Sequence, residues 1–564
     1  MRQLLERQAA RYGSRRFLSL PDGQLSFAET DELANRMAWV LSSHGIGPGD
    51  VVMARCANRQ AMVGTWLGCA KLGSIYMPVN SLLTGPSLRS VMSLAGASLV
   101  VCDADLYPGL APVLGDLPHM RHVLVSGGSA NRRGRSLEAM LEEAPGVAPP
   151  PLADDPGAPA KLMCTSGTTG TPKGVVWSRA CEATWATAYG DEMLPISEDE
   201  GLYSCLPLFH ITCQGTLLAA LRRGGRMTID GRFDPFGFWG RVRRSEAVGF
   251  TFVGTLLAVL ARRPPQPDDA DNQVRWILGS AAPVQEWREI EARFGVSIIE
   301  TWGQTETASC WSAPVCLPQV PGTVGRPSSR CEIRIVGPGG EELGPGEAGE
   351  MHIRPLRPHV MFEGYLARTA DPASIADPAS TADSASTADS ASIADPASIA
   401  DPAGTADPVG SRLRLSRESW TDEGWYRTGD LMIRNPSGDL CFAGRLRESI
   451  RRRGEILPAA LIEAAALRHE SVDEAAAVGV PDDEGVEQEV KLCVVVHPGA
   501  RLGAGELYEF LREQLPKFMV PRYLDFRDEL PKTPTTRVQK VALSESGVGH
   551  CWDSRRSWNR APLP

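Results

Sequence analysis

Short apolar runs alternate with stretches of helical periodicity along the N-terminal half of the chain. The runs at 50–56 and 98–104 are rich in β-branched residues, which is typical of buried strands. Residues 25–45 carry apolar side chains at helical spacing and end at a glycine, and residues 60–78 show a similar helical pattern. This alternation predicts an α/β fold in which helices cover parallel sheets.

The pattern changes after residue 320. Glycine and proline become dense, and alternating apolar runs at 331–337 and 349–355 predict β-hairpins. A smaller α+β unit follows at the C-terminal end. The sequence therefore predicts a large N-terminal domain at 1–444, a small domain at 445–545 and a tail at 546–564.

A six-residue repeat interrupts this organisation. From Ala370, blocks such as ADPASI and ADSAST place an aspartate every six residues as far as Asp407. A cation-binding β-solenoid is one interpretation. The repeat has few large apolar side chains and turn glycines with which to build a core, which favours a low-complexity surface loop inserted at about 370–409.

Composition narrows the class of protein. Hydrophobic residues make up 43% of the 564 residues, which is typical of a globular chain, and the net charge of -10 argues against a general nucleic-acid binder. The start of the chain has no apolar signal segment, and no apolar stretch is long enough to span a membrane. The 13 cysteines form no CxxC pair, so we expect reduced thiols, no structural zinc and a cytoplasmic location.

One polar loop carries candidate chemistry. Residues Cys164 to Val175 read CTSGTTGTPKGV, in which glycines and hydroxyls follow an apolar run. Glycines let the backbone approach a phosphate closely, loop N–H groups and hydroxyls can surround an oxyanion, and Lys173 adds a positive charge. The spacing differs from the Walker pattern, which disfavours a P-loop ATPase. An ordinary Ser/Thr/Gly turn is the alternative interpretation.

This loop resembles the signature of the adenylate-forming superfamily, which includes acyl-CoA synthetases, luciferases and adenylation domains. Other blocks of that family follow in the expected order: LPLFH (206–210), GSAAP (279–283), TWGQTE (301–306), PGTVGRP (321–327), YRTGD (426–430), GRLRESIRRRG (444–454) and LPKTPTTRVQK (530–540). The SIRRRGE and LPKTPT segments are most similar to crotonobetaine/carnitine-type bacterial acyl-CoA ligases.

The resemblance implies a fold and a reaction. The fold has two α/β subdomains and a β-rich subdomain, followed by a small mobile α+β C-terminal domain that rotates between two half-reactions. The reaction is ATP-dependent adenylation of a small-molecule carboxylic acid, followed by transfer to the thiol of CoA. ATP, Mg²⁺ and CoA are the implied cofactors and cosubstrates.

The resemblance also assigns roles to individual residues. The phosphate-binding set comprises Thr165, Ser166, Gly167, Thr168, Thr169 and Lys173. Gly279, Ser280, Ala281 and Trp302 are assigned to the adenine side, Thr305 to the α-phosphate, Glu306 to Mg²⁺, Asp430 and Arg445 to the ribose and phosphate, His210 to the junction of acid and nucleotide, and Gly454 to the thiol tunnel. A structural histidine, core packing and a turn aspartate are the alternative interpretations of His210, Trp302 and Asp430.

The final block departs from the family pattern. Arg537 stands where the family carries the lysine that bridges the substrate carboxylate and the nucleotide. A planar guanidinium and a compact ammonium are not interchangeable. Arg537 could substitute, Lys540 could reach the site instead, or adenylation could be slow. Arg447 occupies the family's hinge position, and the basic triplet 451–453 either attracts CoA phosphates or is a solvated face.

Two other functions stay open from the sequence. Adenylation could serve a different acceptor, either a carrier-protein thiol or, with nitrite as the activated acid, an aromatic amine in diazotisation. The chain could also be a catalytically impaired nucleotide-binding regulator, which Arg537 favours. The joint presence of Lys173, Glu306, Asp430 and Arg445 counts against that regulator.

Overall fold

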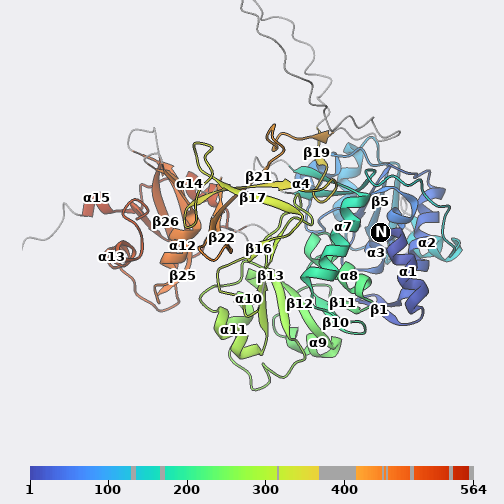
Figure 1. Ribbon diagram of the computed structural model, residues 1–564, viewed down its shortest axis with the longest axis horizontal. Helices are drawn as coiled ribbons and strands as arrows, with labels where there is room; N and C mark the ends of the chain where they lie inside the picture. The colour runs from blue at the N-terminus through green and yellow to red at the C-terminus, as the bar shows by residue number, and fades with distance from the viewer. Residues whose placement is uncertain are drawn as a thin grey trace, which may run out of the picture.

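The computed structural model describes residues 1–128, 135–165, 172–313, 317–367, 415–446, 450–452, 455–482, 488–532 and 538–557. Figure 1 shows the blue and green parts of the chain as one large body, yellow strands crossing it, and the orange and red C-terminal domain at one side. The expected α/β class is confirmed, with sheets covered by helices and a small C-terminal domain. Among the helices of the described residues, none is both long enough and apolar enough to cross a membrane.

The first sheet has nine strands. Six of its strands, β8, β4, β3, β5, β6 and β7, pair in parallel. Strands β9, β19 and β20 continue the sheet beyond β8 with antiparallel pairing. In sheet order the strands are β20 (Leu415–Ser416), β19 (Gly364–Leu366), β9 (Lys173–Ser178), β8 (Pro159–Thr165), β4 (Ile75–Pro78), β3 (Val51–Arg55), β5 (Leu99–Asp103), β6 (His122–Ser126) and β7 (Arg135–Ser136).

The helix expected over 60–78 is too long at its C-terminal end. Helix α3 (Gln60–Leu72) stops at Gly73, which adopts a left-handed conformation with φ 78°. Glycine takes that conformation without steric cost, so it ends the helix. The following apolar residues 75–78 are all buried and form β4, because they continue the parallel sheet.

The second sheet has seven strands, all parallel except for the β1–β2 hairpin. In sheet order they are β14 (Ser297–Glu300), β13 (Trp276–Ser280), β12 (Ala247–Val253), β10 (Gly201–Ser204), β11 (Arg226–Ile229), β1 (Arg16–Leu20) and β2 (Gly23–Ser26).

A layer of helices joins the two sheets. Helices α3 and α7 contact strands of the first sheet, α8 contacts strands of the second, and α1 contacts both α3 and α8 (Figure 1). The predicted helix over 25–45 is confirmed as α2, which begins with a capping box between Ser26 and Glu29. The helices of the large domain, besides α3, are α1 (Arg2–Tyr12), α2 (Phe27–Ser43), α4 (Gly85–Met92), α5 (Tyr107–Leu110), α6 (Leu137–Glu143), α7 (Arg179–Ala188), α8 (Ile211–Arg223), α9 (Phe238–Ser245), α10 (Gly254–Ala261) and α11 (Trp287–Phe294), with a 3₁₀ turn at Ala111–Asp116 and a π-helical turn at Tyr189–Met193.

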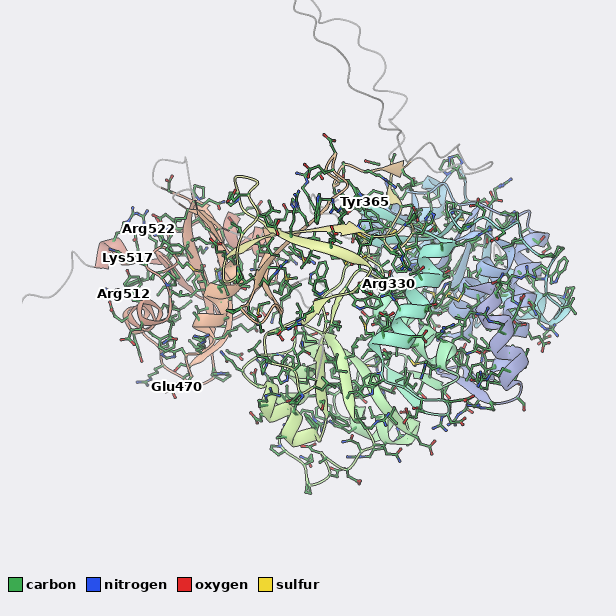
Figure 2. The ribbon with its side chains drawn as sticks, in the orientation of Figure 1. Arg330, Tyr365, Glu470, Arg512, Lys517 and Arg522 are labelled. Atoms are coloured by element: carbon green, nitrogen blue, oxygen red, sulfur yellow. The ribbon has the colours of Figure 1, made fainter. Side chains whose placement is uncertain are left out.

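The β-rich part follows at the centre of the molecule. Its predicted hairpin strands are confirmed as β17 and β18, which pair with each other over their whole lengths. The four-stranded sheet runs β17 (Cys331–Val336), β18 (Ala348–Pro355), β21 (Tyr426–Arg434) and β22 (Leu440–Arg445), and a small ladder joins β15 (Ser312–Ala313) to β16 (Arg326–Pro327). Arg330 ties this part to the large domain through an ion pair with Glu192, with Nη1 2.8 Å from Oε2 (Figure 2).

The C-terminal domain is a four-stranded sheet with helices packed against it. Its elements are β23 (Ile450–Arg452), β24 (Glu455–Leu457), α12 (Ala459–Ala466), β25 (Val472–Pro481), β26 (Gln488–Val496), α13 (Ala504–Gln514), β27 (Tyr523–Phe526), α14 (Lys540–Glu545), β28 (Trp552–Asp553) and α15 (Ser554–Ser557). Strand β28 pairs with β27, so part of the expected tail at 546–564 belongs to this sheet. The domain boundary at 444/445 stays a prediction.

The repeat at 370–409 lies outside the described residues. The strands on either side of the repeat are neighbours, because Leu366 at the end of β19 pairs directly with Leu415 at the start of β20. The chain therefore leaves the nine-stranded sheet and returns to it at neighbouring positions.

Candidate active site

The predicted phosphate loop connects two antiparallel strands of the first sheet. Thr165 ends β8 and pairs with Lys173, which begins β9. Residues 166–171 between them, including Ser166, Gly167, Thr168 and Thr169, lie outside the described residues, so their roles stay predictions. The Lys173 ammonium donates a 2.5 Å hydrogen bond to Glu418 and lies 4.6 Å from the centre of the Tyr365 ring.

A hydrogen-bonded chain runs from this lysine into the TWGQTE segment. The Tyr365 hydroxyl donates to Glu306 Oε1 at 3.0 Å and lies 3.2 Å from the Tyr426 hydroxyl. The Tyr426 hydroxyl in turn lies 3.4 Å from Gln304 Oε1, to which it donates. Tyr365 of β19 thus contacts the predicted Mg²⁺ ligand Glu306 directly, and Tyr426 of β21 links Tyr365 to Gln304. Figure 2 places Tyr365 where the β-rich part meets the large domain.

Asp430 lies at the other end of the same network. Its Oδ2 accepts hydrogen bonds from Trp302 Nε1 at 2.9 Å and from Gln304 Nε2 at 2.8 Å. Its Oδ1 lies 3.5 Å from Nε of Arg445, its cross-strand partner on β22. Asp430 is only 4% exposed. The carboxylate is therefore fixed in orientation beside a guanidinium.

Trp302 combines both interpretations offered by the sequence. Its ring is buried in the main hydrophobic cluster together with Cys310 and Trp311, as core packing predicts. Its indole nitrogen nevertheless binds Asp430 directly. The geometry supports a role in positioning the carboxylate, and contact with adenine stays a prediction.

The surroundings of Glu306 perturb its protonation. Burial raises the pKa of its carboxyl, and the nearby charge of Asp430 raises it further, against the opposing effects of Tyr365 and Arg445. A carboxylate that is costly to ionise in this position would be stabilised by a bound cation. The oxygen donors of Glu306 and its hydroxyl neighbours suit Mg²⁺, a hard cation.

The GSAAP segment forms a turn directly after β13. The Ser280 hydroxyl donates to the Thr301 carbonyl at 2.8 Å, and the Ala281 N–H donates to Glu300 Oε1 at 2.8 Å. Ala281 has a φ of 62°, a conformation that non-glycine residues rarely adopt. Gly279 precedes them at the end of the strand. The turn is thus held against the segment that carries Trp302, and its place beside adenine stays a prediction.

Two further candidates lie on neighbouring elements. His210 is the N-cap residue of α8 and keeps an exposed surface, yet its protein surroundings desolvate the ring and lower its pKa, which keeps the imidazole mostly neutral at pH 7. Asn58 fixes the loop before it, by bonding to the Leu206 carbonyl and the Leu208 N–H. The Thr305 carbonyl accepts a 2.8 Å hydrogen bond from Trp177, which anchors that residue to β9.

The C-terminal candidates are only partly described by the structure. Arg537, Gly454 and Arg447 lie outside the described residues. Lys540 pairs with Glu463 of α12 at 2.6 Å, inside the C-terminal domain. Arg452 of the basic triplet pairs with Glu489 at 2.7 Å and donates to two backbone carbonyls, so it is a structural residue of that domain.

Several residues of the network were not singled out from the sequence. Gln304 and Tyr426 lie inside the motifs TWGQTE and YRTGD, so these two motifs could have identified them as site residues. Tyr365 ends the segment from GEMHIRP (349–355) to GY (364–365), which also resembles a block of the family. Glu418 and Glu300 belong to no motif that the sequence comparison used, and only the fold brings them to the site.

Both parts of the chain match families of known proteins. Residues 5–366 match the AMP-binding enzyme family, and residues 461–537 match the AMP-binding enzyme C-terminal domain. The chain belongs to the AMP-binding enzyme family. It is 30% identical over 547 residues to a sulfoacetate–CoA ligase of Cupriavidus necator, covering 96% of each chain. It is 26% identical to a crotonobetaine/carnitine–CoA ligase of Citrobacter koseri, covering 96% and 98% of the two chains.

Solved structures share the fold. An anthranilate CoA ligase bound to anthranoyl-AMP superposes with a TM-score of 0.78 at 20% identity over 96% of each chain. ATP-bound MatB from Rhodopseudomonas palustris superposes with a TM-score of 0.77 at 24% identity, over 96% of this chain and 98% of that one. The predicted class is confirmed: the enzyme is an ATP-dependent, AMP-forming acid–CoA ligase.

Proposed function

We propose that this enzyme adenylates a small carboxylic acid at the network that links Lys173, Glu306, Asp430 and Arg445. The observation that carries the proposal is Asp430. Its buried carboxylate is oriented by two hydrogen bonds and faces Arg445, while the same network continues through Tyr365 to Lys173. One continuous set of contacts thus joins the group assigned to the ribose with the group assigned to the terminal phosphates.

The first half-reaction needs positive charge around the phosphates. An oxygen of the substrate carboxylate attacks the α-phosphorus of ATP, and the bond to pyrophosphate breaks, with its electron pair leaving on pyrophosphate. Lys173 offsets the charge of the departing group once its ion pair with Glu418 opens, and Arg445 does so beside the ribose. Such preorganised charges typically lower a barrier because they need no reorganisation during the reaction.

Asp430 acts as an acceptor in this scheme. An ionised carboxylate has no proton to donate, so it suits the two hydroxyls of a ribose. Trp302 and Gln304 hold it in position, which fixes where the nucleoside sits. In the second half-reaction the thiolate of CoA attacks the acyl carbon, and AMP leaves with the electron pair of the broken acyl–phosphate bond.

Glu306 is the residue we assign to Mg²⁺. When bound, the ion would neutralise phosphate charge and draw electron density from the reacting phosphoryl group. The Tyr365 hydroxyl, hydrogen-bonded to Glu306 Oε1, orients the carboxylate for that role. The raised pKa of Glu306 means that a proton and the ion compete for it.

The chemistry of the acid is drawn from the relatives. The curated relatives named above act on sulfoacetate and on crotonobetaine or carnitine, and others act on indoleacetate and on medium- and long-chain fatty acids. We propose a small polar acid, because the first two relatives take charged acids of that kind.

A product screen tests the function. The purified enzyme is incubated with Mg²⁺, ATP, CoA and a panel containing sulfoacetate, crotonobetaine, indoleacetate and a fatty acid, and products are identified by mass spectrometry. We expect AMP together with one new acyl-CoA from the polar acids. AMP release without acyl-CoA would favour a carrier-protein acceptor, and a diazo product from nitrite and an aromatic amine would favour diazotisation. ATP binding without AMP would favour the regulator.

A variant pair tests the site. Asp430→Asn keeps the shape of the side chain but removes the charge, and we expect AMP formation to fall on the order of 10²-fold. Asp439→Asn is the matched control, because Asp439 lies on the turn between β21 and β22 and pairs with Arg326 at the surface. Equal activity of both variants would exclude Asp430 from the site.

A further inference from the structure

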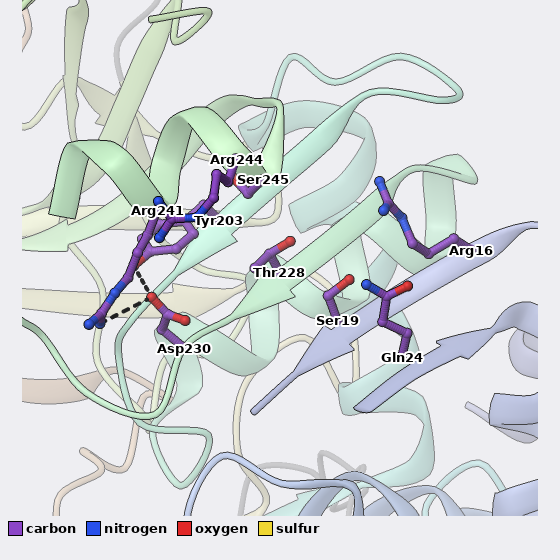
Figure 3. A pocket seen from close by; sticks show the side chains of 9 residues that line it. All are labelled: Arg16, Ser19, Gln24, Tyr203, Thr228, Asp230, Arg241, Arg244 and Ser245. Carbon is purple, nitrogen blue, oxygen red and sulfur yellow. Dashed lines mark hydrogen bonds and ion pairs between the residues drawn. The ribbon is translucent and has the colours of Figure 1, made fainter. Parts of the chain in front are cut away.

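A cavity of about 270 Å³ opens on the outer face of the seven-stranded sheet. Helix α9 packs over β10 and β12, and the cavity lies beside it, over β11 and the β1–β2 hairpin (Figure 3). None of its lining residues belongs to the network around Asp430 and Lys173. The cavity is therefore distinct from the candidate active site.

Its floor is one row of polar side chains across four neighbouring strands. Tyr203 of β10 pairs with Thr228 of β11, Thr228 pairs with Ser19 of β1, and Ser19 pairs with Gln24 of β2. Directly paired residues point to the same face of a sheet. Strands of parallel sheets are usually apolar on both faces. The polar side chains on the parallel strands β10, β11 and β1 depart from that pattern, whereas Gln24 lies on the antiparallel edge strand β2, where polar residues are common.

The hydrogen-bonding groups of this row are largely unused within the protein. Among the described residues, the side chains of Ser19, Thr228 and Gln24 have no hydrogen-bond partner. Tyr203 is the exception, since its hydroxyl donates to Asp230 at 2.6 Å. Two hydroxyls and one carboxamide therefore line the cavity with donors to offer.

Arginines stand on both walls. Figure 3 shows Arg16 and Gln24 on one side and Arg241 and Arg244 on the other, with Thr228 and Ser19 between them. Within the described residues Arg244 makes no ion pair, and the contact of Arg16 with Glu246 is long, at 3.8 Å. These two guanidinium groups are available for an incoming anion.

The one carboxylate of the cavity is compensated. Asp230 lies 3.5 Å from Arg241, which also pairs with Asp234 at 3.0 Å, and it accepts the Tyr203 hydroxyl. Glu246, which is not a lining residue of the cavity, is shared between Arg16 and Arg226. Arg16 and Arg244 therefore leave the cavity with an excess of positive charge.

We propose that this cavity binds a small phosphate-bearing molecule. Its phosphate oxygens accept hydrogen bonds from Arg16 and Arg244 and from the hydroxyls of Ser19 and Thr228. Guanidinium forks match phosphate geometry and give short, charge-assisted hydrogen bonds. The volume of about 270 Å³ is slightly below that of most ligand sites, which commonly span about 300–1,000 Å³, so it fits pyrophosphate or a small phosphorylated metabolite rather than CoA.

Calorimetric titration of the full chain tests the site. Pyrophosphate and orthophosphate are titrated separately at constant ionic strength, against the wild type and against the double variant Arg16→Ala/Arg244→Ala. Arg354→Ala/Arg512→Ala is the matched control, since it removes two exposed arginines elsewhere. Lys173→Ala reports on binding at the active site. We expect the first double variant to weaken at least tenfold a binding event that the control double variant and Lys173→Ala both retain, whereas Lys173→Ala weakens only a separate event at the active site.

Three results would overturn the proposal. They are binding lost only in Lys173→Ala, equal weakening in both double variants, and no binding of either anion to the wild type at millimolar concentration. Binding of pyrophosphate but not orthophosphate supports a site for two linked phosphates, and equal binding supports a site for one. If the alanine double variant unfolds, Arg16→Lys/Arg244→Lys replaces it. Replacement of the two planar guanidinium groups by ammonium groups is then expected to weaken binding at least threefold.

Discussion

The contact between Lys173 and Glu418 places a carboxylate where the family binds phosphate. Glu418 is 59% exposed on its side chain and Lys173 is 28% exposed, so the pair is solvated and weak. In the site that we propose, ATP has to displace this carboxylate before Lys173 binds the phosphates. Glu418 is therefore a competitor of the nucleotide at the lysine.

Glu418→Gln tests this competition. Removal of the negative charge is expected to lower KM for ATP roughly two- to fivefold, which corresponds to a surface ion pair of up to about 1 kcal/mol, with kcat unchanged. Glu423→Gln is the control, because that carboxylate lies in the same segment but faces Arg334. Steady-state AMP formation at varied ATP measures both. A raised KM in Glu418→Gln would mean that Glu418 helps to orient the lysine instead.

Glu300 makes stability depend on pH. Burial raises the pKa of its carboxyl from 4.5 to about 7, against the hydrogen bonds that it accepts from the turn at Ala281. Because the folded pKa exceeds the unfolded one, its contribution to stability is complete below about pH 4.5 and is lost as pH rises through 7. The loss is on the order of 3 kcal/mol.

Glu300→Gln removes this titration. We expect the variant to unfold at a higher temperature than the wild type at pH 8, and the two to converge near pH 5. Thermal unfolding at pH 5, 6, 7 and 8 measures the difference. Gln319, which bonds to the Glu300 backbone, keeps the strand in place in both proteins. Parallel pH profiles would show that Glu300 is ionised in the folded state.

Glu418 and Glu300 are site residues that the sequence did not predict. Lys173, Glu306, Asp430 and Arg445 were found because each stands inside a recognisable motif. Glu418 lies beyond the repeat and reaches Lys173 only because β20 pairs with β19 and β19 with β9. Such a contact depends on strand order, which local periodicity does not encode.

The turn after β13 depends on the close approach of two strands. A Cβ atom on Gly279 would lie 2.2 Å from the Phe252 carbonyl oxygen on β12, its cross-strand neighbour. The obstacle is backbone, so it cannot move aside as a flexible side chain would. Gly303, in the TWGQTE segment, is different, because a Cβ there would meet only the Trp311 Cβ at 3.7 Å.

Gly279→Ala is therefore expected to destabilise the enzyme by about 1–3 kcal/mol. It should also lower AMP formation at least tenfold, since displacement of β13 moves the turn that is bonded to Thr301 and Glu300. Gly303→Ala should unfold within a few degrees of the wild type. Thermal unfolding and AMP release are measured on both variants. Equal melting temperatures would mean that the two strands separate without cost.

The elements themselves were mostly predictable, and the errors have physical causes. The hairpin strands 331–337 and 349–355 were found because alternation of polar and apolar residues is a strong local signal. The helix expected over 60–78 was extended into β4, because a short buried strand is apolar throughout and has no period of its own. Gly73 was the available signal for the break.

An exposed ion pair is one of the contacts between the two domains. Arg262, after α10, pairs with Asp473 of β25 at 3.0 Å, and its side chain is 63% exposed. An exposed pair of this kind contributes roughly 0–1 kcal/mol. A rotation of the C-terminal domain would break it at little cost, which agrees with the predicted mobility. No sequence motif carries this information, because it concerns two surfaces that meet only in the folded chain.

The repeat at 370–409 lies in the connection between β19 and β20, and its deletion tests whether the repeat contributes to folding. Leu366 and Leu415 are cross-strand partners, so the ends of the connection are already adjacent. Deletion of residues 370–409 leaves eight residues between them, enough to join two antiparallel strands. Because the cost of closing a loop grows with its length by about 0.6 kcal/mol per doubling, the shorter connection should stabilise the fold by about 1–2 kcal/mol.

We therefore expect the deletion variant to melt at the same temperature as the wild type or a few degrees higher, with unchanged kcat and KM for ATP. Scanning calorimetry and AMP release test both. Glu418 provides an internal check, because it lies just beyond the deletion: if the join displaces β20, KM for ATP changes as it does in Glu418→Gln, while the melting temperature does not. A large loss of both stability and activity would instead show that the repeat packs against the enzyme, which would refute the surface-loop interpretation.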